Sequence, residues 1–176
     1  IYGADLAYAS TYQQQQDIQV YLNAIKTLAD QLGVTYDYSR LLSDEYKAKF
    51  NNKDSLTAIV TNTIYDTYQY LDEKSNPDLA VSMVSGMWVE LMYIGTNISQ
   101  ASFNSTGLVD IISKQKDSYE KVMSLLAAHN TNADIKALET KLMPLKAAFD
   151  KVPQGLSEAD FNLILQTIKT VRTSLV

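Results

Sequence analysis

The sequence predicts an all-α fold, a single antiparallel bundle of about six or seven helices that forms one domain over residues 1–176. Three observations predict it. Apolar residues recur at three- and four-residue spacing along most of the chain, as on the buried face of a helix. Glycine (6) and proline (3) are scarce, which disfavours turn-rich β architectures. The loops between the periodic segments are short and polar, which is typical of antiparallel neighbouring helices.

The first predicted helix runs from about Ala4 to Leu32 and ends at Gly33, a typical residue after a helix C-terminus. Its apolar stripe, residues 18–32, faces almost the opposite way from the tyrosines of its first half. Either the helix bends near the glutamines at 13–16, or its first half packs on different partners.

The next three helices are marked by caps and breakers. A short helix is expected over about 39–50, and Asp54 is the expected N-cap of a third helix that ends near Leu71. Asn76 is the expected cap of the fourth helix, with Pro77 in the first turn, where its missing N–H costs nothing. This fourth helix continues to about Gln100 and is apolar nearly all round, as a central buried helix is.

The last three helices form the second half of the chain. A fifth is expected over about 108–128, with His129 at its C-terminus, where a cation suits the helix dipole. Asn132 is the expected cap of a sixth helix whose apolar seam, 135–152, is interrupted by a kink at Pro144.

The seventh helix is expected to begin with a capping box of Ser157 and Asp160 and to carry apolar residues from Phe161 to Leu175. The chain also changes in composition, because eleven of its twelve tyrosines lie before residue 94. A localised function is therefore expected in the tyrosine-rich half.

Composition excludes several functional classes. The net charge of −5 disfavours nucleic acid and anionic membrane surfaces as partners, because both require a basic patch. The two arginines, Arg40 and Arg172, offer little for bidentate phosphate recognition. The absence of cysteine excludes disulfides and thiolate sites, and the single histidine excludes any site that needs two imidazoles. No apolar run of about 18 residues occurs, so no transmembrane segment is expected.

Glu90 is the first candidate site residue. It lies within "SGMWVELMYIG" (85–95), and on a helix it shares an apolar face with Gly86 and Tyr93. A buried carboxylate must be paired or hydrogen-bonded, become protonated, or meet a ligand. The structural interpretation is a bond to a Tyr, Asn or Lys of a neighbouring helix, or an edge position that reaches solvent. The functional interpretation is a ligand-facing acid, and the segment 2–12 is the expected neighbour.

The second candidate is the face of the first helix that carries Asp5, Tyr8 and Tyr12, with Tyr2 near its edge. Aromatic rings with polar tips around one carboxylate suit a pocket for a sugar, an amine or a peptide. The alternative is that the tyrosines pack on the bundle while Asp5 stabilises the helix N-terminus.

Catalytic motifs are absent. The sequence has no Glu-x-x-His, Gly-x-Ser-x-Gly, P-loop or dinucleotide fingerprint, so we expect no cofactor and assign no catalytic or metal-binding residue. Asp5 with Glu90 is the one pair of acids that would suit a hydrolase.

Two segments resemble a group of uncharacterised predicted lipoproteins of Bacteroidota: "IYGADLAYASTYQQQQDIQVYLNAIKTLADQLGV" (1–34) and "SGMWVELMYIGT" (85–96). The resemblance covers mainly the first hundred residues. It implies an all-helical domain that is exported, in the periplasm or anchored at the outer membrane. Because the chain starts without Met, a lipid anchor upstream of it is part of this expectation. The resemblance carries over no activity and no functional residue.

Three functions follow from these patterns. The first is an exported, non-enzymatic domain that binds a small ligand or peptide through these residues: Glu90, Asp5, Trp88, Tyr93, Tyr8 and Tyr12. The second is a structural or protein-interaction module whose partner meets the apolar seams of the last three helices. The third and least favoured is a hydrolase. A Glu90 that is exposed in a concave pocket favours binding, whereas a Glu90 that is sealed by a neighbouring helix favours the structural module.

Overall fold

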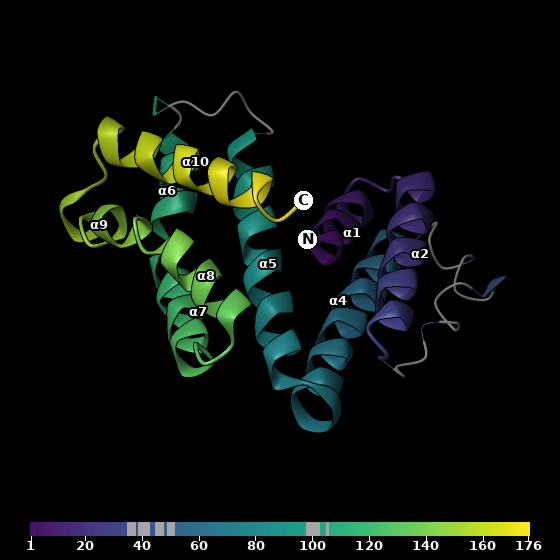
Figure 1. The fold of residues 1–176 in the computed structure, drawn as a ribbon. Helices are drawn as coiled ribbons and strands as arrows, with labels where there is room; N and C mark the ends of the chain where they lie inside the picture. The colour runs from purple at the N-terminus through teal and green to yellow at the C-terminus, as the bar shows by residue number, and fades with distance from the viewer. Residues whose placement is uncertain (35–37, 39–42, 45–47, 49–51, 98–102, 105) are drawn as a thin grey trace. The chain divides into compact units, whose positions relative to one another are not determined.

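The structure is a computed structural model that describes residues 1–34, 38, 43–44, 48, 52–97, 103–104 and 106–176. All regular secondary structure in these residues is helical, which confirms the predicted all-α class (Figure 1). The chain divides into two compact units, Ile1–Met83 and Val84–Val176. The expectation of a single domain stays a prediction. The short helix expected over 39–50 lies largely outside the described residues.

The first unit contains α1 (Tyr2–Thr11), α2 (Gln15–Gln31), α4 (Lys53–Tyr70), a π-helical turn η2 (Leu71–Ser75) and the start of α5 (Pro77–Asn97). The helix α1 packs against both α2 and α4, and Figure 1 shows these three helices side by side. Their inward side chains form one apolar core, whose fully buried large members are Leu6, Ile18 and Leu56.

The helix predicted over 4–32 is two helices, and the bend near the glutamines is confirmed. The residue Gln13 takes a left-handed backbone conformation, with φ of 55°. Its N–H donates to the Ser10 carbonyl at 3.1 Å, and the Gln14 N–H donates to the Ala9 carbonyl at 2.9 Å. This pair of bonds is a Schellman motif, which closes α1 and lets the chain turn into α2.

The second helix ends in the same way, at the predicted glycine. Gly33 has φ of 70°, and its N–H donates to the Asp30 carbonyl at 3.2 Å. The Val34 N–H donates to the Ala29 carbonyl at 2.9 Å, and both of these side chains are buried.

Side chains cap α4 and α5. The prediction that Asp54 caps α4 is wrong. The N-cap is Asn52, whose side chain accepts a hydrogen bond from the Ser55 N–H at 2.9 Å. Asn52 precedes the first helical residue and has extended backbone geometry, as a cap requires. The prediction for α5 is confirmed, since the Asn76 side chain accepts from the Leu79 N–H and Pro77 is the first helical residue.

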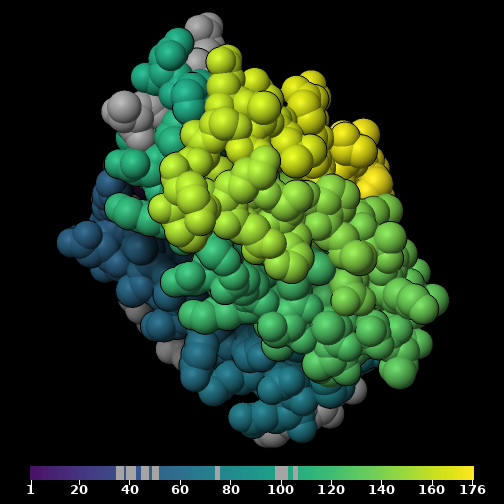
Figure 2. Space-filling model, turned by 90° about the vertical axis from the view of Figure 1, so that its left-hand side faces the viewer, coloured from purple at the N-terminus to yellow at the C-terminus, as the bar shows by residue number. Residues whose placement is uncertain are grey.

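The second unit contains the rest of α5 and the helices α6 (Thr106–Ser113), α7 (Lys116–Ala128), α8 (Ala133–Leu142), α9 (Leu145–Phe149), the 3-10 turn η3 (Val152–Gln154) and α10 (Glu158–Thr173). The helices α7 and α10 each pack on α8, and α10 also packs on α9. On the face drawn in Figure 2, the yellow-green and yellow residues of α8 to α10 form one continuous surface.

Two helices predicted as continuous are interrupted in this unit. The helix predicted over 108–128 is broken at Lys114 and Gln115, where the Gln115 N–H turns back to the Ile112 carbonyl at 3.0 Å. Pro144 does more than kink the sixth helix, because it separates α8 from α9. A proline lacks the N–H that would continue the hydrogen-bond ladder.

The remaining cap predictions of the second unit are confirmed. The Asn132 side chain accepts from the Asp134 N–H at 3.0 Å and begins α8. Ser157 and Asp160 form the reciprocal capping box of α10. His129 is the C-cap residue of α7.

Candidate functional site

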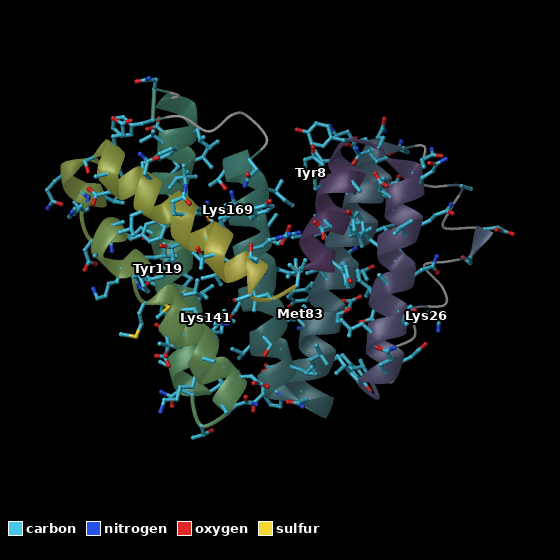
Figure 3. All side chains as sticks on the ribbon, turned by 45° about the horizontal axis from the view of Figure 1, so that its top comes forward. Tyr8, Lys26, Met83, Tyr119, Lys141 and Lys169 are labelled. Carbon is cyan, nitrogen blue, oxygen red and sulfur yellow. The ribbon has the colours of Figure 1, made fainter. Side chains whose placement is uncertain are left out.

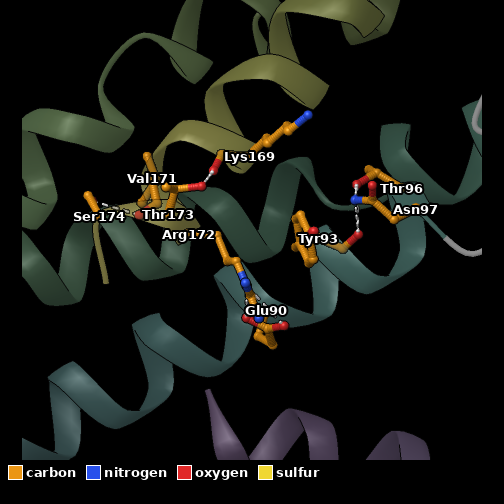
Figure 4. Close-up of polar contacts among 9 residues, drawn as sticks. All are labelled: Glu90, Tyr93, Thr96, Asn97, Lys169, Val171, Arg172, Thr173 and Ser174. Atoms are coloured by element: carbon orange, nitrogen blue, oxygen red, sulfur yellow. Dashed lines mark hydrogen bonds and ion pairs between the residues drawn. The ribbon is translucent and has the colours of Figure 1, made fainter. Parts of the chain in front are cut away.

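Glu90 is buried, as predicted, with 1% of its surface exposed. The partner that the structure shows is Arg172, from the last turn of α10. The Arg172 Nε donates to Glu90 Oε2 at 3.0 Å and, less closely, to Oε1 at 3.4 Å (Figure 4). The guanidinium carbon of Arg172 also lies 4.6 Å from the centre of the Tyr93 ring.

This arrangement satisfies the electrostatic requirement of the buried carboxylate. An ionised carboxylate without a partner is costly in a protein interior, whereas one that meets a guanidinium is neutralised and hydrogen-bonded. The ring of Tyr93 adds an aromatic face to the cation. The Arg172 side chain remains 29% exposed, whereas that of Glu90 is 2% exposed.

The expected partner was a Tyr, Asn or Lys of a neighbouring helix, and the arginine on Glu90 corrects that prediction. The expectation that segment 2–12 lies near Glu90 stays a prediction, because that segment belongs to the other unit. A signal for the arginine was present. On a wheel of α10, Arg172 falls between Phe161 and Leu165, at one side of the apolar face. A cation beside the apolar face of one helix can pair with a carboxylate on the apolar face of another.

Trp88 lies in the core of the second unit. It is buried, and its ring centre is 6.0 Å from that of Tyr119, which in turn stacks on Phe149 at 4.9 Å. The Trp88 Nε1 and the Ser85 hydroxyl have no hydrogen-bond partner in the described part of the chain. Trp88 therefore contributes a packed aromatic surface to the core, and its role as a wall of a ligand pocket stays a prediction.

The α1 residues predicted to share a face do lie together. The rings of Tyr8 and Tyr12 are 4.7 Å apart, and Tyr12 is 58% exposed (Figure 3 labels Tyr8). Asp5 is half-buried in the first turn of α1, where a carboxylate suits the helix N-terminus. Asp5 and Glu90 belong to different units, so the predicted pairing of these two acids stays a prediction.

The described residues contain no cluster of three or more His, Asp or Glu side chains that would hold a metal ion. A shallow hollow of about 600 Å³ lies over one face of α7 and is lined by Asp117, Glu120, Lys121, Ser124 and Leu125. Among the described helices, α5 alone is long and apolar enough to cross a membrane. Half of its apolar window is buried inside the protein, and buried core helices pass the same test, so this is weak evidence for a membrane span.

No family model, curated protein or solved structure matches this chain. The geometry of the described residues therefore carries the functional argument by itself.

Proposed function

We propose that this protein is a non-catalytic helical module that works by binding another protein. The acid that would have anchored a small ligand, Glu90, is buried and already neutralised by Arg172. A carboxylate that is fully engaged inside its own fold supports a structural role for this part of α5. By the same reasoning, hydrolysis by paired carboxylates is the least supported alternative.

The observation that carries the proposal is an apolar row on the surface of α2. Val20, Leu28 and Leu32 are 61%, 44% and 52% exposed, and they lie on one ridge of the helix at four-residue multiples. The buried residues of α2, Ile18, Leu22 and Ala29, lie opposite Val20, and the ridge runs toward their side of the helix at Leu28 and at the C-cap residue Leu32. Single exposed leucines are ordinary, but an apolar ridge over three turns is typical of a helix that docks against a partner.

The surroundings of this ridge favour a protein partner over an ionic ligand. The charged side chains Lys26 and Asp30 lie at another edge of α2 and pair with each other at 2.7 Å. The residues beside the ridge include Gln16, Thr27 and Gln31, which are polar and uncharged. The exposed Asp17 lies one turn before Val20, so the rim carries one charge at its N-terminal end, while the rest of it is polar and uncharged. An apolar centre with few charges around it resembles the core of protein interfaces, where charged residues are depleted.

Burial of the apolar seams in the second unit favours α2 as the contact surface. The seams of the last three helices were expected to meet a partner, but Leu142, Leu145, Phe149, Ile164 and Ile168 are buried within the second unit. They form the protein's own core and leave α2 as the better-supported contact surface.

A photo-crosslinking experiment tests the proposal. A photoreactive amino acid is placed at Val20 and, as the matched control, at Lys136, which is exposed on α8. On irradiation in the native host, we expect a discrete protein adduct from position 20 only. The adduct should disappear when Leu28 and Leu32 are both replaced by Glu, with the helical content unchanged. Equal adducts at both positions, or an adduct that survives the double substitution, would contradict the proposal.

A second candidate function is the binding of a small ligand or peptide at the α1 tyrosines. The contact of the Tyr8 and Tyr12 rings, with Tyr12 exposed, favours it, because stacked surface tyrosines suit sugar or peptide faces. Titration with glucose oligosaccharides should then shift the ring NMR signals of Tyr12 and leave those of the buried Tyr119 unchanged. Equal shifts at both tyrosines, or none, would count against this function.

We also propose that the module is exported, to the periplasm or to a lipid anchor at the outer membrane. The resemblance of residues 1–34 and 85–96 to predicted lipoproteins supports this location. Fractionation of cells that express the natural gene should place the protein in the envelope fraction, and recovery in the cytosol would refute it.

A further inference from the structure

The C-terminal end of α10 is held by three polar contacts. Arg172 donates to Glu90 of α5 at 3.0 Å and lies over Tyr93 of the same helix. Two residues further on, the C-cap residue Ser174 accepts from the Lys141 ammonium of α8 at 2.9 Å. Both helices that flank this end of α10 thus contact it through directional bonds (Figure 4 shows Glu90, Tyr93, Arg172 and Ser174).

Between its two ends the inner face of α10 is apolar, while at the N-terminal end the buried Asp160 pairs with Lys151 at 2.7 Å. Phe161, Ile164 and Ile168 are fully buried. Apolar burial depends on area and not on direction, so these side chains discriminate weakly between neighbouring positions of the helix. Ile164 and Ile168 are spaced by one turn, and a shift of α10 by about 5.4 Å along its axis would place one isoleucine where the other lies.

Glu90 removes this ambiguity. A shift by one turn would carry Arg172 away and leave a carboxylate with 1% exposure unpaired in the interior. Alternative packings of α10 would therefore be costly even if their apolar contacts were equally good. The pair makes one position of the helix distinct from the others.

We propose that the Glu90–Arg172 ion pair is a register lock, which selects one position of α10 and contributes little net stability. Desolvation of two charges offsets most of their attraction, and apolar replacements of whole buried pairs are often neutral or stabilising. Polar groups in helical cores are known to determine register in this way, at a cost in stability. This inference is independent of the α2 surface on which the proposed function rests.

The test separates stability from uniqueness of packing. Arg172→Met leaves Glu90 buried and unpaired, and we expect a clearly lower melting temperature. The double variant Glu90→Leu with Arg172→Met should recover the wild-type melting temperature to within a few degrees. It should nevertheless broaden or double the methyl NMR signals of Ile164 and Ile168 and bind a hydrophobic dye. The matched control removes an exposed pair, Lys146→Met with Asp150→Leu, and should leave these signals single.

Two results would overturn the proposal. Single sharp methyl signals in the double variant would show that the register of α10 does not depend on the Glu90–Arg172 pair. A double variant that is as unstable as Arg172→Met would show that the pair is a net source of stability. Glu90→Gln, which keeps the shape of the side chain and removes its charge, provides a second variant: doubling of the Ile168 signal is expected, and an unchanged signal argues against the lock.

Discussion

Tyr119 shows how a single polar atom is accommodated in the core of the second unit. Its ring is buried between Trp88 and Phe149, and its hydroxyl donates to the carbonyl of Leu142 at 3.2 Å. Burial raises the pKa of Tyr119 to about 12, and the negative charge of Asp150 adds to the effect. The neutral phenol is therefore the form that the fold requires.

Replacing Tyr119 by Phe should destabilise the protein less at alkaline pH than at neutral pH. Near pH 7 the variant loses one buried hydrogen bond, and we expect its free energy of unfolding to fall by about 1 kcal/mol. Because the folded pKa of Tyr119 is raised above the ordinary 10.0, the unfolded wild type ionises first as the pH rises. The wild type thus loses stability between about pH 10 and 12, and the variant lacks this loss at position 119.

Urea unfolding at pH 7, 9 and 11 measures the effect. The advantage of the wild type over Tyr119→Phe should be constant from pH 7 to 9 and smaller at pH 11. If the difference in free energy of unfolding is the same at all three pH values, the Tyr119 phenol ionises alike in the folded and the unfolded state, which would contradict the prediction.

Helix ends are the best-defined features at the scale of the element. Asn132, Ser157 and Asn76 cap their helices through side-chain oxygens, as their positions before apolar periodic segments predict. The end of α1 is different, because Gln13 holds the left-handed conformation that Gly33 holds at the end of α2. A side chain at such a position costs about 1–2 kcal/mol relative to ordinary backbone.

Replacing Gln13 by Gly should stabilise the protein. Glycine relieves the backbone strain at φ of 55°. It also increases the entropy of the unfolded chain, which offsets part of this gain. The free energy of unfolding should therefore rise by up to about 1 kcal/mol. The control is Gln14→Gly, since Gln14 has an ordinary φ of −79° and only the entropic loss applies. Thermal melting of both variants checks this, and the idea fails if Gln13→Gly melts at or below the temperature of Gln14→Gly.

At the scale of the whole molecule, the two units share one helix. The boundary between Met83 and Val84 falls inside α5, which runs unbroken from Pro77 to Asn97. Leu79, Ala80 and Met83 pack in the core of the first unit, whereas Trp88 packs against Tyr119 in the second. Unfolding of either unit would therefore leave part of a continuous helix without its packing surface.

We expect the two units to unfold together for this reason. Leu56 is fully buried in the first unit, and Leu56→Ala should cost about 2–5 kcal/mol. Trp88 is the single tryptophan and reports on the second unit by its fluorescence, while circular dichroism reports on all helices. The melting temperature measured by both probes should fall by the same amount. A Trp88 transition that stays at the wild-type temperature would show that the units melt independently.

Much of this fold is encoded locally and is visible in the sequence. Helical periodicity, the caps at Asn76, Asn132 and Ser157, and the glycine at the end of α2 each depend on a few neighbouring residues, so each was predicted correctly. The break at Gln13 was visible only indirectly, as a change in the direction of the apolar face. The split at Gln115 had no proline or glycine to mark it.

The sequence by itself determined that Glu90 is buried, because a helix that is apolar nearly all round leaves a carboxylate in its middle little contact with solvent. Only the tertiary structure decided what meets that carboxylate. Arg172 lies 82 residues further along the chain, and no local spacing rule connects two side chains on different helices. The same limit applies to surfaces: periodicity marks which residues are apolar, but packing decides that the α10 seam is core and that Val20 on α2 is exposed.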